Sequence, residues 1–143
     1  MNAEGERQFV DTNVLVYAHD VSAGDKHARA RSLVEHLWQA ELGCLSTQVL
    51  QEFCVVSTTK GPRPIPLEKA ARIVAQLSQW RVHRPTVDSI LSAMRLQSRY
   101  QVSFWDALIV ESALELGCST IWSEDLNPGQ AYGSVTVASP FLP

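Results

Sequence analysis

The sequence predicts an α/β fold in which a parallel β-sheet is covered by helices on both faces. Short apolar segments alternate along the chain with longer segments whose apolar residues recur at helical spacing. This alternation is typical of parallel sheets, because parallel strands are joined by helical crossovers. The 143 residues, 45% of them hydrophobic and 19% charged, suit one soluble domain with a packed core. We therefore expect residues 1–143 to form a single domain.

Five short apolar segments are expected to be strands. The first of them, Phe9-Val10, ends directly before Asp11. The expected strands cover residues 9–10, 43–46, 80–83, 119–122 and 134–137. Residues 60–66 contain three prolines and one glycine, which exclude a regular element and mark the one clear loop.

Six segments are expected to be helices, because they combine capping residues with helical apolar spacing. They cover residues 13–19, 26–40, 48–57, 67–77, 87–99 and 104–116. The expected N-caps include Thr12 or Asn13, Asp25, Thr47 and Thr86.

Two of these helices carry apolar patterns that predict how they pack. In the helix at 87–99, one stripe is expected to face inward, made of Val87, Ile90, Leu91 and Met94. The helix at 104–116 is apolar nearly all round and is expected to pack between other layers, with Gly117 ending it.

Composition excludes several classes of protein. No apolar run approaches the roughly 20 residues of a membrane span, and the polar N-terminus does not resemble a signal peptide, so we expect a cytoplasmic protein without membrane contact. Cys44, Cys54 and Cys118 lack CxxC spacing and are expected to be buried free thiols. The net charge of −3 neither indicates nor excludes binding to nucleic acid.

Four acidic residues lie inside or beside apolar segments, namely Asp11, Glu52, Asp106 and Asp125. A carboxylate in such a place costs several kcal/mol unless it is compensated. In parallel sheets, ligands bind outside the carboxyl ends of the strands. Asp11 and Asp125 follow two predicted strands, Glu52 lies in the helix that leaves another, and Asp106 lies in the first turn of its helix. We therefore expect them to share one site.

Such a cluster suits divalent cations, because Mg²⁺ and Mn²⁺ prefer oxygen ligands. Two ions about 3.5–4 Å apart can activate a water and stabilise the leaving oxygen in phosphodiester hydrolysis. Each acid also has an ordinary explanation: a turn or cap for Asp11, a solvated helix face for Glu52, a favourable first-turn charge for Asp106 and a turn for Asp125. Glu124 is an alternative to Asp125 as the inward residue.

The acidic blocks, taken in order, resemble the PIN domain family, and most of all the small VapC-like toxins of bacterial toxin–antitoxin pairs. The blocks are Asp11-Thr12-Asn13, then Ser46-Thr47-Gln48-Val49-Leu50-Gln51-Glu52-Phe53, then Phe104-Trp105-Asp106-Ala107-Leu108-Ile109, then Trp122-Ser123-Glu124-Asp125-Leu126.

The resemblance implies a three-layer α/β/α sandwich with a parallel sheet of about five strands. It further implies that Asp11, Glu52, Asp106 and Asp125 bind one or two Mg²⁺ or Mn²⁺ ions and hydrolyse RNA, with Asp11 and Asp106 as primary ligands. Asn13 would support the first aspartate, and Ser123 matches a Ser/Thr near the fourth acid. VapC-like proteins commonly form homodimers and are silenced by a cognate antitoxin.

Two other functions are compatible with parts of the pattern. A haloacid-dehalogenase-like phosphatase also begins with a strand-end aspartate, but it needs a second acid where this chain has Asn13. A non-catalytic RNA- or protein-binding module is the other alternative. Lys60 and Arg63 are candidate contacts for RNA phosphates, against the simpler interpretation of a solvated basic loop. The four tryptophans, Trp38, Trp80, Trp105 and Trp122, are expected to be core or half-buried residues.

Overall fold

The computed structural model describes residues 5–142 and contains one six-stranded sheet with the order β3-β2-β1-β4-β6-β5. The strands are β1 (Gln8–Val10), β2 (Gly43–Ser46), β3 (Arg81–His83), β4 (Thr120–Trp122), β5 (Ala131–Tyr132) and β6 (Val135–Ala138). Five of them pair in parallel, and β5 alone pairs antiparallel with β6. The predicted parallel sheet is confirmed, while the two-residue β5 was not anticipated.

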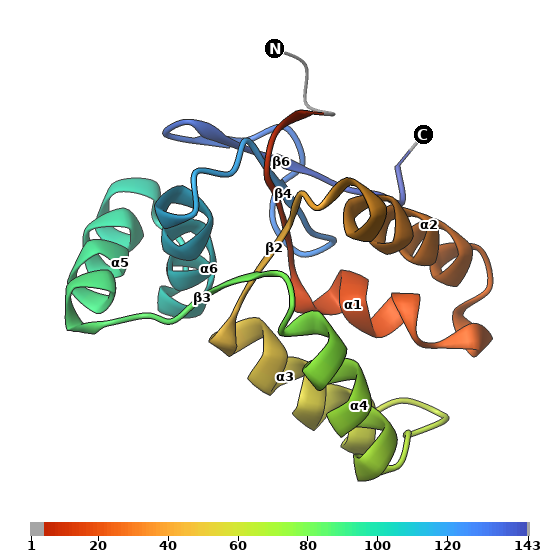
Figure 1. Cartoon of the computed structure of the whole chain (residues 1–143). Helices are drawn as coiled ribbons and strands as arrows, with labels where there is room; N and C mark the ends of the chain where they lie inside the picture. The colour runs from red at the N-terminus through yellow and green to blue at the C-terminus, as the bar shows by residue number, and fades with distance from the viewer. Residues whose placement is uncertain (1–4, 143) are drawn as a thin grey trace.

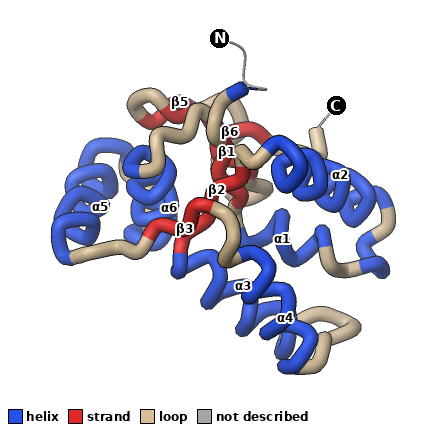
Figure 2. The backbone as a smooth tube through the Cα atoms, viewed as in Figure 1, coloured by secondary structure: helices blue, strands red, loops and turns tan. Residues whose placement is uncertain are grey.

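Helices lie on both sides of this sheet (Figures 1 and 2). They are α1 (Thr12–Ala18), α2 (Asp25–Ala40), α3 (Thr47–Thr59), α4 (Leu67–Leu77), α5 (Val87–Tyr100) and α6 (Phe104–Glu115), with a short 3₁₀ turn η2 (Val21–Ala23). Figure 1 shows α5 and α6 on one side and α1 and α2 on the other, while α3 and α4 lie near the end of the sheet where β1 leads into α1. The α/β fold with helices on both faces is therefore confirmed.

Strand β1 lies at the centre of the core. Phe9 and Val10 are fully buried between β2 and β4, and Val10 is in register with Trp122 of β4. The backbone N–H of Asp11 donates to the carbonyl of Trp122 in β4, so the residue that follows β1 is still fixed to the sheet. The short apolar run thus holds the first aspartate at the carboxyl edge.

Three helix N-caps lie one or two residues earlier than expected. Asp11, Gly24 and Ser46 cap α1, α2 and α3, in place of Thr12 or Asn13, Asp25 and Thr47. For α1 and α3 the observed and the expected caps both have side chains that can cap, so the sequence pattern does not distinguish the positions, whereas Gly24 caps α2 without a side-chain hydrogen bond. Thr86 is confirmed as the cap of α5, where it forms a capping box with Ser89.

The predicted orientation of α5 is wrong. Its stripe of Val87, Ile90, Leu91 and Met94 is exposed, from 41% at Ile90 to 71% at Val87. The face that packs against α6 contains Ser89 and Ala93 instead, whose small side chains allow the two helices to approach closely. Helical spacing identifies the residues that share a face of a helix, but it does not show which face is buried.

Helix α6 matches its prediction. All residues from 107 to 113 are buried, and the helix packs against α5 on one side and against β2, β4 and β6 on the other. Gly117 has a φ of +70°, which is the backbone conformation expected of a glycine just beyond a helix end.

Two expectations from composition can be compared with the structure. Cys44 and Cys118 are buried free thiols as predicted, whereas Cys54 is only partly buried. None of the helices in residues 5–142 is long and apolar enough to cross a membrane. The polar N-terminal segment used to argue against a signal peptide lies partly outside these described residues.

Candidate active site

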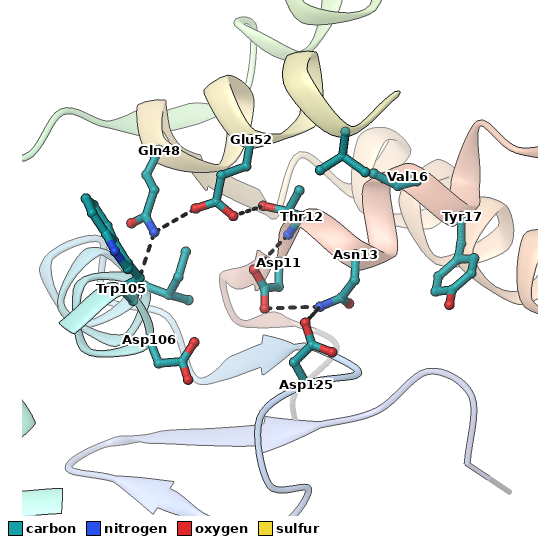
Figure 3. A pocket seen from close by; sticks show the side chains of 12 residues that line it. Asp11, Thr12, Asn13, Val16, Tyr17, Gln48, Glu52, Trp105, Asp106 and Asp125 are labelled. Atoms are coloured by element: carbon teal, nitrogen blue, oxygen red, sulfur yellow. Dashed lines mark hydrogen bonds between the residues drawn. The ribbon is translucent and has the colours of Figure 1, made fainter. Parts of the chain in front are cut away.

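The four acidic residues line one cavity of about 380 Å³ at the carboxyl edge of β1, β2 and β4 (Figure 3). Asp11 follows β1 directly, Glu52 lies in α3, Asp106 lies in the first turn of α6, and Asp125 lies in the turn after β4. The structure therefore brings together residues that are up to 114 positions apart in the chain.

Asp11 is the most buried of the four, with only 7% of its surface exposed. Its Oδ1 accepts a hydrogen bond from the Thr12 N–H at 2.8 Å. Its Oδ2 accepts from Ser123 Oγ at 2.8 Å and from Asn13 Nδ2 at 3.3 Å. Burial raises the pKa of Asp11 from 3.8 to about 6, although the hydrogen bonds from Ser123 and Thr12 lower it; the charges of Glu52 and Asp125 raise it further.

Asn13 joins two of the acids. Its Nδ2 donates to Oδ2 of Asp11 and, at 3.1 Å, to Oδ2 of Asp125, while its Oδ1 accepts from the backbone N–H of Glu124 at 3.0 Å. Both ends of the amide are therefore used to fix the turn after β4 against the start of α1.

Ser123 holds the same turn from inside. Its side chain is fully buried, and its Oγ accepts from the backbone N–H groups of Asp125 at 3.1 Å and Leu126 at 3.2 Å while donating to Asp11. One hydroxyl thus shapes the turn that carries Asp125 and orients Asp11.

Glu52 is fixed by two neutral donors. Its Oε2 accepts from Thr12 Oγ1 at 3.2 Å, and its Oε1 accepts from Gln48 Nε2 at 2.8 Å. Gln48 Nε2 also donates to the backbone carbonyl of Trp105 at 3.3 Å, so this one side chain connects α3 with the start of α6. Within the described chain, the buried Oε1 of Gln48 has no hydrogen-bond partner.

Gln48 is the site residue that the sequence analysis did not consider. The available signal was its position four residues before Glu52, which places both side chains on the same face of a helix.

Asp106 differs from the other three acids. Its backbone N–H donates to the Ser103 side chain that caps α6, but its carboxylate has no hydrogen-bond partner in the part of the chain that the structure describes. Figure 3 shows it on the side of the cavity opposite Glu52.

Asp125, and not Glu124, lines the cavity. The Glu124 carboxylate accepts from Tyr17 Oη at 2.9 Å and forms an ion pair with Lys26. Those contacts hold the turn to α1 and α2 from outside, so the alternative assignment to Glu124 is not supported.

Oxygen donors of this kind suit Mg²⁺ or Mn²⁺ in their chemistry. As the side chains stand, however, residues 5–142 contain no group of three His, Cys, Asp or Glu close enough to hold a metal ion. The structure thus provides a shared cavity lined by four carboxylates, without an assembled set of ligands.

The candidate RNA contacts Lys60 and Arg63 line a second hollow rather than the acidic cavity itself. The two hollows share Val16 and Val56, so they adjoin along α1 and α3. The basic loop therefore lies at the far end of a surface that begins at the carboxylates.

Comparison with known proteins agrees with this fold. VapC20 of Mycobacterium tuberculosis, described as a Sarcin-Ricin loop cleaving toxin, superposes with a TM-score of 0.62 at 23% identity, over 82% of this chain and 89% of that one. A toxin–antitoxin complex from Klebsiella pneumoniae contains a chain with a TM-score of 0.67 at 17% identity, over 94% of this chain and 98% of that one. No curated protein matches the sequence.

The family model of the PIN domain matches residues 9–132, which contain all four acids and the strands that position them. The chain therefore belongs to the PIN domain family.

Proposed function

We propose that this chain is an Mg²⁺- or Mn²⁺-dependent endoribonuclease that hydrolyses RNA phosphodiester bonds at the acidic cavity. The observation that carries the proposal is the convergence of Asp11, Glu52, Asp106 and Asp125 on one cavity, with Asp11 buried at its base. Membership of the PIN family and the structural similarity to a toxin described as cleaving the Sarcin-Ricin loop support the same chemistry.

In this proposal Asp11 and Asp106 are the primary metal ligands, and Glu52 and Asp125 complete the set. A bound divalent cation would supply the Lewis acid that polarises the phosphodiester and activates a water. Without a cation, burial disfavours the charged form of Asp11, and the charges of Glu52 and Asp125 disfavour it further.

The neutral residues around the acids have orienting roles. Asn13 and Ser123 hold Asp11 and the turn of Asp125 in register, and Gln48 and Thr12 hold Glu52. Fixing three of the acids, from three segments, in this way lowers the reorganisation needed when the substrate binds.

The RNA strand is proposed to run from the acidic cavity toward Lys60 and Arg63. Gln48, Glu52 and Val56 follow at intervals of four along α3 and line the acidic cavity, and Val56 also lines the hollow that contains Lys60 and Arg63. Lys60 and Arg63 would supply phosphate contacts at a distance from the carboxylates, which suits a protein whose net charge is −3.

Biologically, we propose the toxin of a toxin–antitoxin pair, acting as a homodimer in the cytoplasm and silenced by a cognate antitoxin. Structural similarity to a chain of a toxin–antitoxin complex supports the antitoxin partner. Light scattering would test the homodimer, and co-expression with the product of a neighbouring small reading frame would test the antitoxin.

The central experiment measures cleavage of a mixed, fluorescently labelled RNA pool with Mn²⁺, Mg²⁺ or EDTA. We expect metal-dependent cleavage that is lost in Asp11→Asn and in Asp106→Asn, and retained in Asp88→Asn, which removes a charge from the exposed start of α5. Cleavage that persists in EDTA or in both active-site variants would contradict the proposal.

The path toward the basic loop has its own test. Lys60→Ala/Arg63→Ala should weaken RNA binding and reduce its dependence on salt concentration, because fewer counterions are released. Lys69→Ala/Arg72→Ala removes the same two charges from exposed positions on α4 and serves as the matched control. If RNA binding depends equally on salt concentration in the two double variants, Lys60 and Arg63 do not contact the RNA phosphates.

The two alternatives fare differently. The phosphatase is disfavoured, because Asn13 occupies the position of the required acid and uses both ends of its amide to hold other groups. A non-catalytic module would bind RNA or protein without cutting, and the cleavage assay separates it from the proposed nuclease.

A further inference from the structure

The indole of Trp105 lies exposed at the rim of the acidic cavity. Its 63% exposure is contrary to the expectation that all four tryptophans are core or half-buried. Trp105 directly precedes Asp106 and is one of the residues that line the cavity (Figure 3). An indole has a broad apolar face, so at the rim of a polar cavity it can cover the flat face of a ligand.

We propose that Trp105 is a stacking platform for one unpaired base of the RNA, next to the bond that is cut. The inference rests on the proposed ribonuclease function and adds a substrate class, namely a single-stranded or flipped-out nucleotide.

The platform is held in place before RNA binds. The Phe104 ring contacts the Trp105 ring edge to face, with centroids 5.2 Å apart. The backbone carbonyl of Trp105 accepts from Gln48 Nε2, the same group that donates to Glu52. The backbone that carries the indole is therefore linked through one amide to a carboxylate of the cavity, which fixes the start of α6 relative to that acid.

Stacking also provides an RNA contact that the negative charge of the site does not oppose. Four carboxylates repel a phosphate backbone, whereas a base is uncharged and every base has a π-face that an indole can cover. Stacking on an aromatic side chain requires a base with a free face, so a continuous duplex is excluded and an unpaired segment is selected. Trp105 and the Lys60–Arg63 loop would thus make different kinds of contact on either side of the carboxylates.

A protein partner is the competing occupant, and the exposed stripe of α5 is the better candidate for that role. The exposed face of α5 is formed by four apolar residues, namely Val87, Ile90, Leu91 and Met94. Trp105, in contrast, lines the acidic cavity together with Gln48 and Asp106, which favours a ligand that also reaches the acids.

The test measures binding of a labelled single-stranded RNA dodecamer, with Mn²⁺ present and on the Asp106→Asn background to limit cleavage. Trp105→Ala should weaken binding about tenfold, because the stacking surface is lost, and Trp105→Phe should recover most of the loss, because a ring is restored. Met94→Ala, an exposed apolar residue of α5, is the matched control and should bind like the background.

Removing bases from the RNA tests the same contact with no further change to the protein. Abasic substitution at one position of the dodecamer should weaken binding about as much as Trp105→Ala, and the two changes together should cost little more than either alone. If Trp105→Ala folds poorly, Trp105→Leu, which keeps an apolar side chain but has no ring to stack, takes its place in this cycle.

The outcomes separate the two proposals. Absence of RNA binding in the background and in the wild type would overturn both. Binding that is insensitive to Trp105→Ala, or a Trp105→Ala chain whose mass by light scattering falls to that of a monomer while RNA binding is unchanged, would overturn base stacking alone.

Discussion

The burial of Asp11 should make the stability of the metal-free protein fall as pH rises. Its pKa is about 6 in the folded chain against an ordinary value of 3.8, because burial disfavours the charged form. Between these two values the unfolded chain has lost the proton and the folded chain still binds it. Unfolding therefore becomes more favourable with increasing pH through this window, and the stability available below it is lost.

The size of the effect follows from the two pKa values. A difference between 3.8 and about 6 corresponds to a loss of about 3 kcal/mol in the free energy of unfolding once Asp11 is ionised in both states. Integration over the titration places about 2 kcal/mol of this loss between pH 4 and pH 8.

The perturbation is Asp11→Asn, which removes the charge at nearly constant shape. Urea unfolding in EDTA at pH 4 and pH 8 gives the stability of variant and wild type at each pH. We expect the variant to gain about 2 kcal/mol relative to the wild type between the two pH values, because its site no longer contains an ionisable group at position 11. Any constant cost of replacing the hydrogen bonds from Thr12, Asn13 and Ser123 cancels in this comparison.

Asp88→Asn, with the same change at the exposed start of α5, controls for the effect of net charge. Saturating Mn²⁺ at pH 8 should stabilise the wild type, because an ion that binds only the native protein shifts the unfolding equilibrium toward it. Asp11→Asn, which lacks a proposed ligand, should gain almost no stability. An equal stability difference between variant and wild type at both pH values would refute the argument that Asp11 is a destabilising buried charge.

Three further changes test a site hydrogen bond, a close contact at the start of β2 and a helix cap. Ser123→Ala should destabilise the fold by about 1–3 kcal/mol, because the N–H groups of Asp125 and Leu126 lose their acceptor. It should also raise the pKa of Asp11 further, because the hydrogen bond from Ser123 lowers that pKa. An unchanged urea midpoint would contradict the expected destabilisation. Gly43→Ala should cost about 1–3 kcal/mol, because the added Cβ would lie 2.4 Å from the Trp80 ring, whereas Gly5→Ala meets no atom within 4 Å and serves as the control in the same thermal melts. Thr86→Ala should cost about 1 kcal/mol by removing the capping box of α5, and Ser92→Ala in the same helix is the comparison that should not show this loss.

Local sequence signals predicted the sheet well because its strands are short, apolar and separated by helices. Phe9-Val10, for example, can only be buried, and its neighbours β2 and β4 are the other short apolar segments with helices on either side. The orientation of α5 failed for a physical reason. Its buried residues are the small Ser89 and Ala93, which the partly buried Leu96 flanks, and hydrophobicity alone does not identify a face whose buried residues are small.

The candidate site was predictable to the extent that it depends on strand ends. The carboxyl edge of a parallel sheet gathers the residues that follow its strands, so Asp11 and Asp125 could be assigned to one place. Gln48 and the exposed ring of Trp105 were not predictable in this way. Their roles depend on which side chains meet across the interface between α3 and α6, and that is a property of tertiary packing.

Asn13 explains why this site carries an amide where a phosphatase would carry an acid. The residue donates to Asp11 and Asp125 and accepts from the Glu124 backbone, and an amide supplies the two N–H donors together with the acceptor that these contacts need. A carboxylate at position 13 would add charge beside Asp11, whose ionised form is already disfavoured by burial. The site therefore concentrates negative charge in the four residues that line the cavity as acids, and neutral side chains hold three of them, Asp11, Glu52 and Asp125.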